Sequence, residues 1–104
     1  MPVYVLEPPS RYNHAYAGPV IERVLPLGAA RAACAHMGVD ADACSWVIAG
    51  RCHIVIPRGG PVKDLGAYRR HELAHCNGWT HGHGAGADIE TDQPTPSTGV
   101  EGQR

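Results

Sequence analysis

The stretch HELAHCNGWTH, residues 71–81, determines how the rest of this chain of 104 residues is interpreted. If the stretch begins as a helix, His71 and His75 lie one above the other, because residues four apart share one helix face. Two imidazoles in that arrangement can bind one metal ion. Gly78 then supplies the left-handed turn that ends a helix, and the chain bends so that His81 can return as a third ligand.

The ligands in this stretch indicate zinc, in a catalytic rather than a structural site. Three nitrogen ligands, from His71, His75 and His81, leave one position open, whereas structural zinc sites are closed by four protein ligands. Glu72 lies one position round from the ligand face of the helix, so its carboxylate can reach a water on the metal without being a ligand itself. We therefore expect a bound Zn²⁺ ion, with Glu72 as the general base that takes the proton of the attacking water.

The spacing HExxHxxGxxH resembles the signature of metzincin metallopeptidases, and residues 71–81 match each of its fixed positions. The resemblance implies a zinc-dependent endopeptidase that cleaves a peptide or protein substrate in an extended conformation. In metzincins an edge strand of the sheet lies above the active-site helix and pairs with that substrate. The resemblance therefore implies that residues 52–56, or their hairpin partner, bind the substrate here.

One part of the metzincin pattern is missing from this chain. The family places a methionine-containing turn beneath the metal, downstream of the third histidine. The two methionines of this chain, Met1 and Met37, both precede the motif. The chain therefore resembles a minimal zincin, with an active-site helix, its supporting sheet and little else.

Two other functions are compatible with the same residues. In a non-catalytic binding module, zinc would only stabilise the fold, and a fourth protein ligand such as His83 or a cysteine would close the site. His83 is also an alternative to His81 as the third ligand, because Gly82 between them is flexible. In the other function, the same zinc chemistry would act on an amide or ester in a small molecule.

Two aromatic residues flank the ligands. Tyr68 lies one turn before His71 on roughly the same helix face, and its hydroxyl is a candidate for stabilising the oxyanion formed during hydrolysis. The alternative is a structural tyrosine whose hydroxyl stays in solvent. Trp79 lies in the turn between the second and third ligands. We expect it to be a core residue buried under the turn, in preference to a substrate contact.

Length and charge restrict the class of protein. A chain of 104 residues forms one domain with a modest core. Its net charge of -1 argues against nucleic acid or an anionic membrane as the main partner, and we expect a monomer. No apolar run approaches the ~20 residues of a membrane helix, and the N-terminus lacks the pattern of a signal peptide. We expect a soluble protein, either cytoplasmic or exported.

The four cysteines have spacings unlike those of zinc fingers or redox-active Cys-x-x-Cys motifs. An even number permits two disulfides, with three possible connectivities. The favoured pairs are Cys34 with Cys44, which would close a short loop after a helix, and Cys52 with Cys76, which would join a strand to the metal-binding helix. The alternative is four reduced, buried thiols that pack as small apolar residues.

The remaining sequence predicts an α+β fold, in which a backing helix and a short antiparallel or mixed sheet pack on the active-site helix. The expected elements, in chain order, are a strand at 3–6 followed by an irregular arm, a strand at 20–25, a helix at 28–37, hairpin strands at 45–48 and 51–56, and a helix from the N-cap Asp64 to Asn77. Residues 1–91 are expected to form this single zincin-like domain. Residues 92–104 are expected to be a disordered tail, because they are polar and contain few apolar side chains.

Overall fold

A computed structural model describes residues 5–81 of the chain. Its elements are β1 (Val20–Pro26), α1 (Leu27–His36), β2 (Cys44–Ile48), β3 (Arg51–Arg58) and α2 (Leu65–Cys76). They form a mixed three-stranded sheet with two helices, which confirms the expected α+β fold. The predicted tail, and the predicted domain end at residue 91, lie outside the described residues. Within residues 5–81, no helix has the length and apolar character that crossing a membrane requires.

The sheet has the strand order β1-β3-β2, so β3 is its central strand. β1 runs parallel to β3 with Val20 opposite Cys52, and β2 runs antiparallel to β3 as the predicted hairpin partner. The hairpin turn has Ala49 at φ 53° and Gly50 at φ 75°, the left-handed conformations of a type I′ turn. Because β1 covers the other side of β3, only β2 of the two substrate-strand candidates lies at an edge of the sheet.

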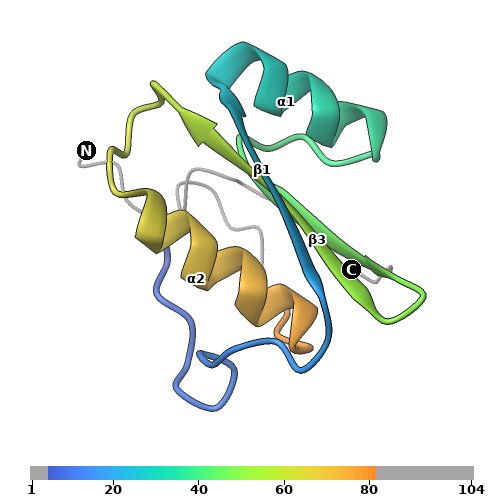
Figure 1. Cartoon of the computed structure of the whole chain (residues 1–104). Helices are drawn as coiled ribbons and strands as arrows, with labels where there is room; N and C mark the ends of the chain where they lie inside the picture. Colours follow the sequence, from blue (N-terminus) through green and yellow to red (C-terminus); the bar gives the residue numbers. More distant parts are fainter. Residues whose placement is uncertain (1–4, 82–104) are drawn as a thin grey trace.

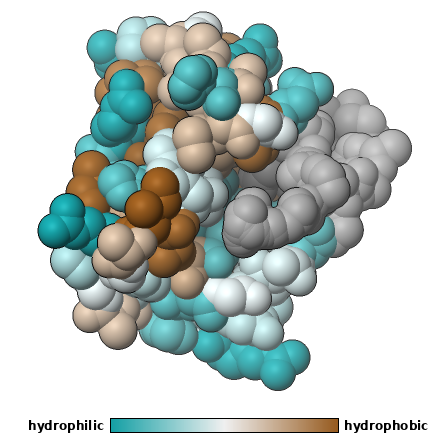
Figure 2. All heavy atoms as spheres, turned by 90° about the vertical axis from the view of Figure 1, so that its right-hand side faces the viewer, coloured by the Kyte–Doolittle hydropathy of each residue, from teal (hydrophilic) through white to brown (hydrophobic). Residues whose placement is uncertain are grey.

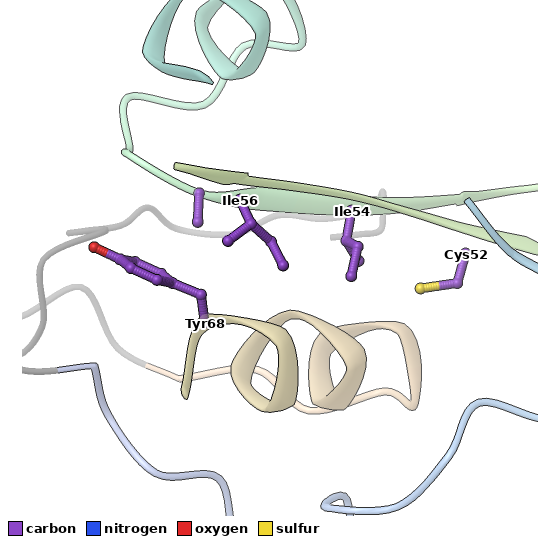
Figure 3. Packing of buried hydrophobic residues seen from close by; sticks show 5 residues of the cluster. Cys52, Ile54, Ile56 and Tyr68 are labelled. Atoms are coloured by element: carbon purple, nitrogen blue, oxygen red, sulfur yellow. The ribbon is translucent and has the colours of Figure 1, made fainter. Parts of the chain in front are cut away.

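The two helices cover opposite faces of the sheet (Figure 1). Successive side chains of a strand point to opposite faces, so Cys52, Ile54 and Ile56 pack toward α2 while Val55 packs toward α1. Figure 3 shows this row of β3 side chains facing α2, with the ring of Tyr68 between the helix and the sheet. An apolar layer therefore holds α2 on β3 and fixes the direction in which its other side chains point.

The predicted helix and strand bounds agree with the structure to within one or two residues. α1 starts one residue before the predicted helix, at Leu27, and β3 continues two residues beyond its predicted end, to Arg58. α2 starts directly after Asp64, whose Oδ1 atom accepts a hydrogen bond from the backbone N–H of Ala67 at 3.3 Å. That bond satisfies one of the N–H groups left without a partner in the first turn of a helix.

Both favoured disulfides are present, Cys34–Cys44 and Cys52–Cys76. The first joins α1 to the first residue of β2, and the second joins β3 to the last residue of α2. A disulfide in a small domain contributes about 2–4 kcal/mol to stability, mainly by restricting the unfolded chain. The alternative of four reduced thiols is wrong for this structure.

The predicted strand at residues 3–6 is not found in its described part, because Val5 and Leu6 belong to no strand. They begin an irregular arm, residues 5–17, that runs along the side of α2 away from the sheet (Figure 1). The carbonyl group of Leu6 lies 2.7 Å from a ring nitrogen of His71 in α2, so this backbone group serves the helix instead of the sheet. Near the other end of the arm, the Tyr16 hydroxyl donates to the carbonyl of Gly50 in the hairpin turn.

Candidate metal centre

A turn at the end of α2 brings the third histidine back toward the helix. Gly78 has a φ of 104°, and its N–H donates to the carbonyl of His75 at 3.0 Å. The next N–H, of Trp79, donates to the carbonyl of Ala74 at 3.0 Å. This pair of bonds is the Schellman motif, in which a glycine in a left-handed conformation ends the helix and changes the direction of the chain. The chain then continues to His81, beside the helix it has just left.

The three predicted ligands meet at one place. The Nε2 atom of His81 lies 3.1 Å from the Nε2 atom of His71 and 3.1 Å from that of His75. Nitrogen ligands at 2.0–2.1 Å from a tetrahedral zinc ion lie about 3.3 Å apart. The cluster therefore has close to the spacing that a single metal ion requires.

The other ring nitrogens of the two helical histidines are bonded to backbone carbonyls. His71 Nδ1 lies 2.7 Å from the carbonyl oxygen of Leu6, and His75 Nδ1 lies 2.7 Å from that of Trp79. Because a carbonyl only accepts, each Nδ1 carries a proton, and in the neutral ring this leaves the lone pair of Nε2 for a metal. Hydrogen bonds of this kind fix the tautomer and the ring orientation of histidines that bind metals.

Trp79 packs against all three imidazoles. Its ring centroid lies 4.9 Å from that of His71, 5.0 Å from that of His75 and 4.7 Å from that of His81. The indole is stacked on His75, with 14° between the planes, and only 7% of Trp79 is exposed. As expected, Trp79 is a buried residue, and the structure adds that it supports the ligand cluster directly.

Burial differs across the site. His71 is fully buried and Glu72, the candidate general base, is 2% exposed, whereas His75 and His81 are half-buried. Solvent therefore reaches the cluster from the side of the second and third ligands. The side chain of Glu72, which directly follows the first ligand in the chain, is thus buried in the protein.

The structure places Tyr68 in the core. The residue is fully buried, and its ring packs with Ile54 and Ile56 of β3 (Figure 3). The expected alternative of a tyrosine hydroxyl in solvent is therefore wrong, because the side chain turns toward the sheet. The buried ring supports α2, and a role of the Tyr68 hydroxyl in stabilising the oxyanion stays a prediction. His83, the alternative third ligand, lies outside the described residues.

Two contributors to the site carry no recognisable signal in the sequence. One is the carbonyl group of Leu6, which is 65 positions away from the histidine it contacts. The other is Asn77, whose Nδ2 atom donates to the carbonyls of Tyr12 at 3.0 Å and His14 at 2.8 Å. Both contacts involve backbone carbonyls of the arm. Every residue has a backbone carbonyl, so no side-chain pattern predicts which carbonyls make these contacts.

Chemically, the cluster is a candidate site for a divalent metal ion. The His, Cys, Asp and Glu side chains that could hold such an ion within residues 5–81 are His71, His75 and His81, with ligand atoms within 4.8 Å of one another. Three neutral imidazoles suit zinc, and also other transition metals. An ion held by three ligands keeps room for a water or a substrate atom.

The chain matches no protein-family model, and comparisons with curated proteins and with solved structures gave no match either.

Proposed function

We propose that this protein is a zinc-dependent metallopeptidase. The observation that carries the proposal is the convergence of the Nε2 atoms of His71, His75 and His81, with the Nδ1 atoms of the first two bonded to carbonyls. When bound, zinc supplies a water whose pKa is lowered toward ~7 and a Lewis acid for the scissile carbonyl. The preset orientation of the rings supports a site built to hold the metal in one geometry.

Glu72 is the proposed general base. It follows His71 directly in α2, and its side chain is buried, with 2% of the residue exposed. In the proposed reaction its carboxylate takes a proton from the attacking water and delivers it to the leaving nitrogen of the peptide. Exclusion of bulk water from this position favours transfer of the proton to the substrate.

The edge strand β2 supports a peptide as the substrate. α2 ends close to this strand, since the Sγ atom of Cys76 lies 3.9 Å from the carbonyl oxygen of Trp46 in β2. An edge strand can add an extended peptide through its backbone groups. Val47 and Ile48 of β2 are 44% and 55% exposed, so this strand presents apolar side chains to solvent. Figure 2 shows that apolar residues reach the surface of the molecule on the face that it draws. We propose that the substrate pairs with β2 and contacts its exposed apolar side chains.

Trp79 is proposed to replace the support that metzincins obtain from their methionine-containing turn. No methionine follows His81 in the sequence. The indole ring instead packs against the three ligand rings from within the motif itself.

The two disulfides indicate an oxidising compartment as the place of action, because disulfides persist there and are rare in a reducing cytosol.

The number of ligands separates the hydrolase from a zinc-stabilised binding module. Structural zinc sites use four protein ligands. The cluster within residues 5–81 has three, and His83, the candidate fourth ligand, lies outside these residues. We propose that the fourth position holds water, as catalysis requires. The edge strand beside α2, in turn, favours a peptide over an amide or ester in a small molecule.

The test combines zinc analysis with cleavage of a peptide library read by mass spectrometry. The wild-type protein is expected to bind one zinc ion and to cleave peptides. Glu72→Gln should keep the zinc and lose about 10²–10⁴-fold in cleavage rate, which is the usual contribution of a general base. Glu22→Gln is the matched control, because Glu22 lies on β1 and pairs with Arg69, and its cleavage rate should stay that of the wild type.

The other outcomes are equally specific. A zinc-loaded wild-type protein that cleaves no peptide but hydrolyses small amides or esters would show the small-molecule hydrolase. A zinc-loaded protein that hydrolyses neither class would show the binding module. Retained cleavage by Glu72→Gln would remove Glu72 from the mechanism.

A further inference from the structure

The N-terminal arm contacts α2 at two places beside the metal centre. The carbonyl of Leu6 accepts a hydrogen bond from His71, the first ligand, at 2.7 Å. The carbonyls of Tyr12 and His14 accept hydrogen bonds from the side-chain amide of Asn77, which directly follows the last residue of α2. Figures 1 and 3 both show the arm on the side of α2 opposite the sheet. The arm therefore reaches the helix at the first ligand and again two residues beyond the second ligand.

We propose that the arm, residues 5–17, is part of the metal centre and that Asn77 is the positioning residue that holds it there. A histidine that binds metal almost always donates its other ring N–H to a partner, and loss of that partner weakens metal binding. For His71 that partner is a carbonyl of the arm, so the orientation of this ring depends on where the arm lies. The inference rests on the metal site of the proposed function, but it does not depend on peptide hydrolysis.

Besides the ligand His71 itself, Asn77 is the residue at the end of α2 whose side chain is hydrogen-bonded to the arm within residues 5–81. Its single amide group donates two hydrogen bonds, and the residue is half-buried. The ion pair between Arg70 of α2 and Glu7 of the arm is longer, at 3.5 Å, and its side chains are 45% and 61% exposed. Exposed ion pairs contribute little, because water and salt screen them. Loss of the Asn77 amide is therefore the change that should release the arm.

The coupling between the arm and the metal must act in both directions. If a docked arm raises the affinity for zinc, then bound zinc stabilises the docked arm by the same factor. Arg11 lies in the middle of the arm and offers a cleavage site for trypsin. Trypsin cuts a chain that has left its docked position, so the rate of cleavage after Arg11 reports on docking. Zinc is thus expected to slow this cleavage in the wild-type protein.

The experiment compares the wild type with Asn77→Ala, Asn77→Asp and the control Arg69→Ala. The control removes an ion pair of α2 with Glu22 of β1 and does not touch the arm. Zinc affinity is measured by competition with a chelator, and the ligand geometry is checked by the absorption spectrum of the Co²⁺-substituted protein. We expect both Asn77 variants to bind zinc ~10-fold more weakly or worse, as is usual when a partner of a ligand is lost. Asn77→Asp keeps the size of the side chain. Its carboxylate oxygens cannot donate hydrogen bonds to the carbonyls of Tyr12 and His14.

Cleavage by trypsin supplies an independent readout. Zinc should protect the bond after Arg11 in the wild type and in Arg69→Ala, and protection should fall in the Asn77 variants by the factor lost in affinity. Wild-type zinc binding with unchanged affinity in both Asn77 variants would overturn this inference and leave the proposed function standing. A wild-type protein that binds no zinc would overturn both. Equal losses in Arg69→Ala and the Asn77 variants would show a general effect of α2 stability and would also overturn the inference.

Discussion

The Nδ1 atom of His75 lies 2.7 Å from the carbonyl oxygen of Trp79, so the second ligand is held by the turn that follows its own helix. The same turn carries the chain to His81. Gly78 forms the turn at a φ of 104°. One local structure therefore orients one ligand, places another and presents Trp79 to both rings.

This relationship predicts that Gly78→Ala weakens the metal site as well as the fold. A side chain at this φ is strained, which costs roughly 1–2 kcal/mol. An added Cβ atom would meet nothing within 4 Å, so the cost comes from the backbone and not from a clash. We expect a lower melting temperature without metal and a lower zinc affinity. Thermal denaturation and chelator competition measure the two effects.

Gly28→Ala is the matched control for that prediction. Gly28 lies in α1, its added Cβ atom would also meet nothing within 4 Å, and its backbone is not in the left-handed region. Alanine at such a position should stabilise the protein by about 0.4–1 kcal/mol through the unfolded state. If Gly78→Ala bound zinc as tightly as Gly28→Ala does, the turn would not be the element that positions His75 and His81.

The sequence predicted the elements whose signals are local. The ligand spacing on α2, the N-cap Asp64 and the glycine after the helix each act within one or two turns of the chain, and the structure brings the three histidines together as expected. The two disulfide pairs were also predictable, because few cysteines are available and the pairs join neighbouring elements.

The contacts that sequence could not predict join distant backbone groups. The parallel pairing of β1 with β3 puts β3 in the middle of the sheet, and nothing in either strand alone specifies that neighbour. The direction of Tyr68 was missed for a different reason. Position 68 lies about 60° round the helix from position 71. This angle is small enough to suggest a shared face, yet large enough for the ring to pack under the sheet.

The two disulfides should differ in their effect on the metal site. The Cys52–Cys76 bond fixes the residue directly after His75 to the central strand, whereas the Cys34–Cys44 bond lies between α1 and β2. Replacing either pair by alanine should lower the free energy of unfolding by about 2–4 kcal/mol. Only Cys52→Ala with Cys76→Ala is expected to lower zinc affinity measurably. Comparable zinc affinities in the two double variants, each measured well below its melting temperature, would contradict this role of Cys76.

The ion pair between Glu22 of β1 and Arg69 of α2 predicts a pH-dependent part of the stability. The two side chains form hydrogen bonds of 2.6 Å and 2.8 Å. The hydrogen bond from Arg69 lowers the pKa of Glu22 below its ordinary value of 4.5, although partial burial opposes this shift. A carboxyl group with a lowered pKa in the folded state stabilises the protein above its ordinary pKa. That contribution is lost as the pH falls through the lower value of the folded state.

Glu22→Gln measures this contribution. The pair is partly exposed, with 28% of the Glu22 side chain and 41% of the Arg69 side chain accessible, so we expect a loss of at most about 1 kcal/mol at pH 7. The variant should melt at a lower temperature than the wild type at pH 7, and the two melting curves should converge as the pH falls below 4.5. High salt should reduce the difference at pH 7, because it screens an exposed pair. A difference that persisted unchanged at low pH would assign the effect of the substitution to packing instead of charge.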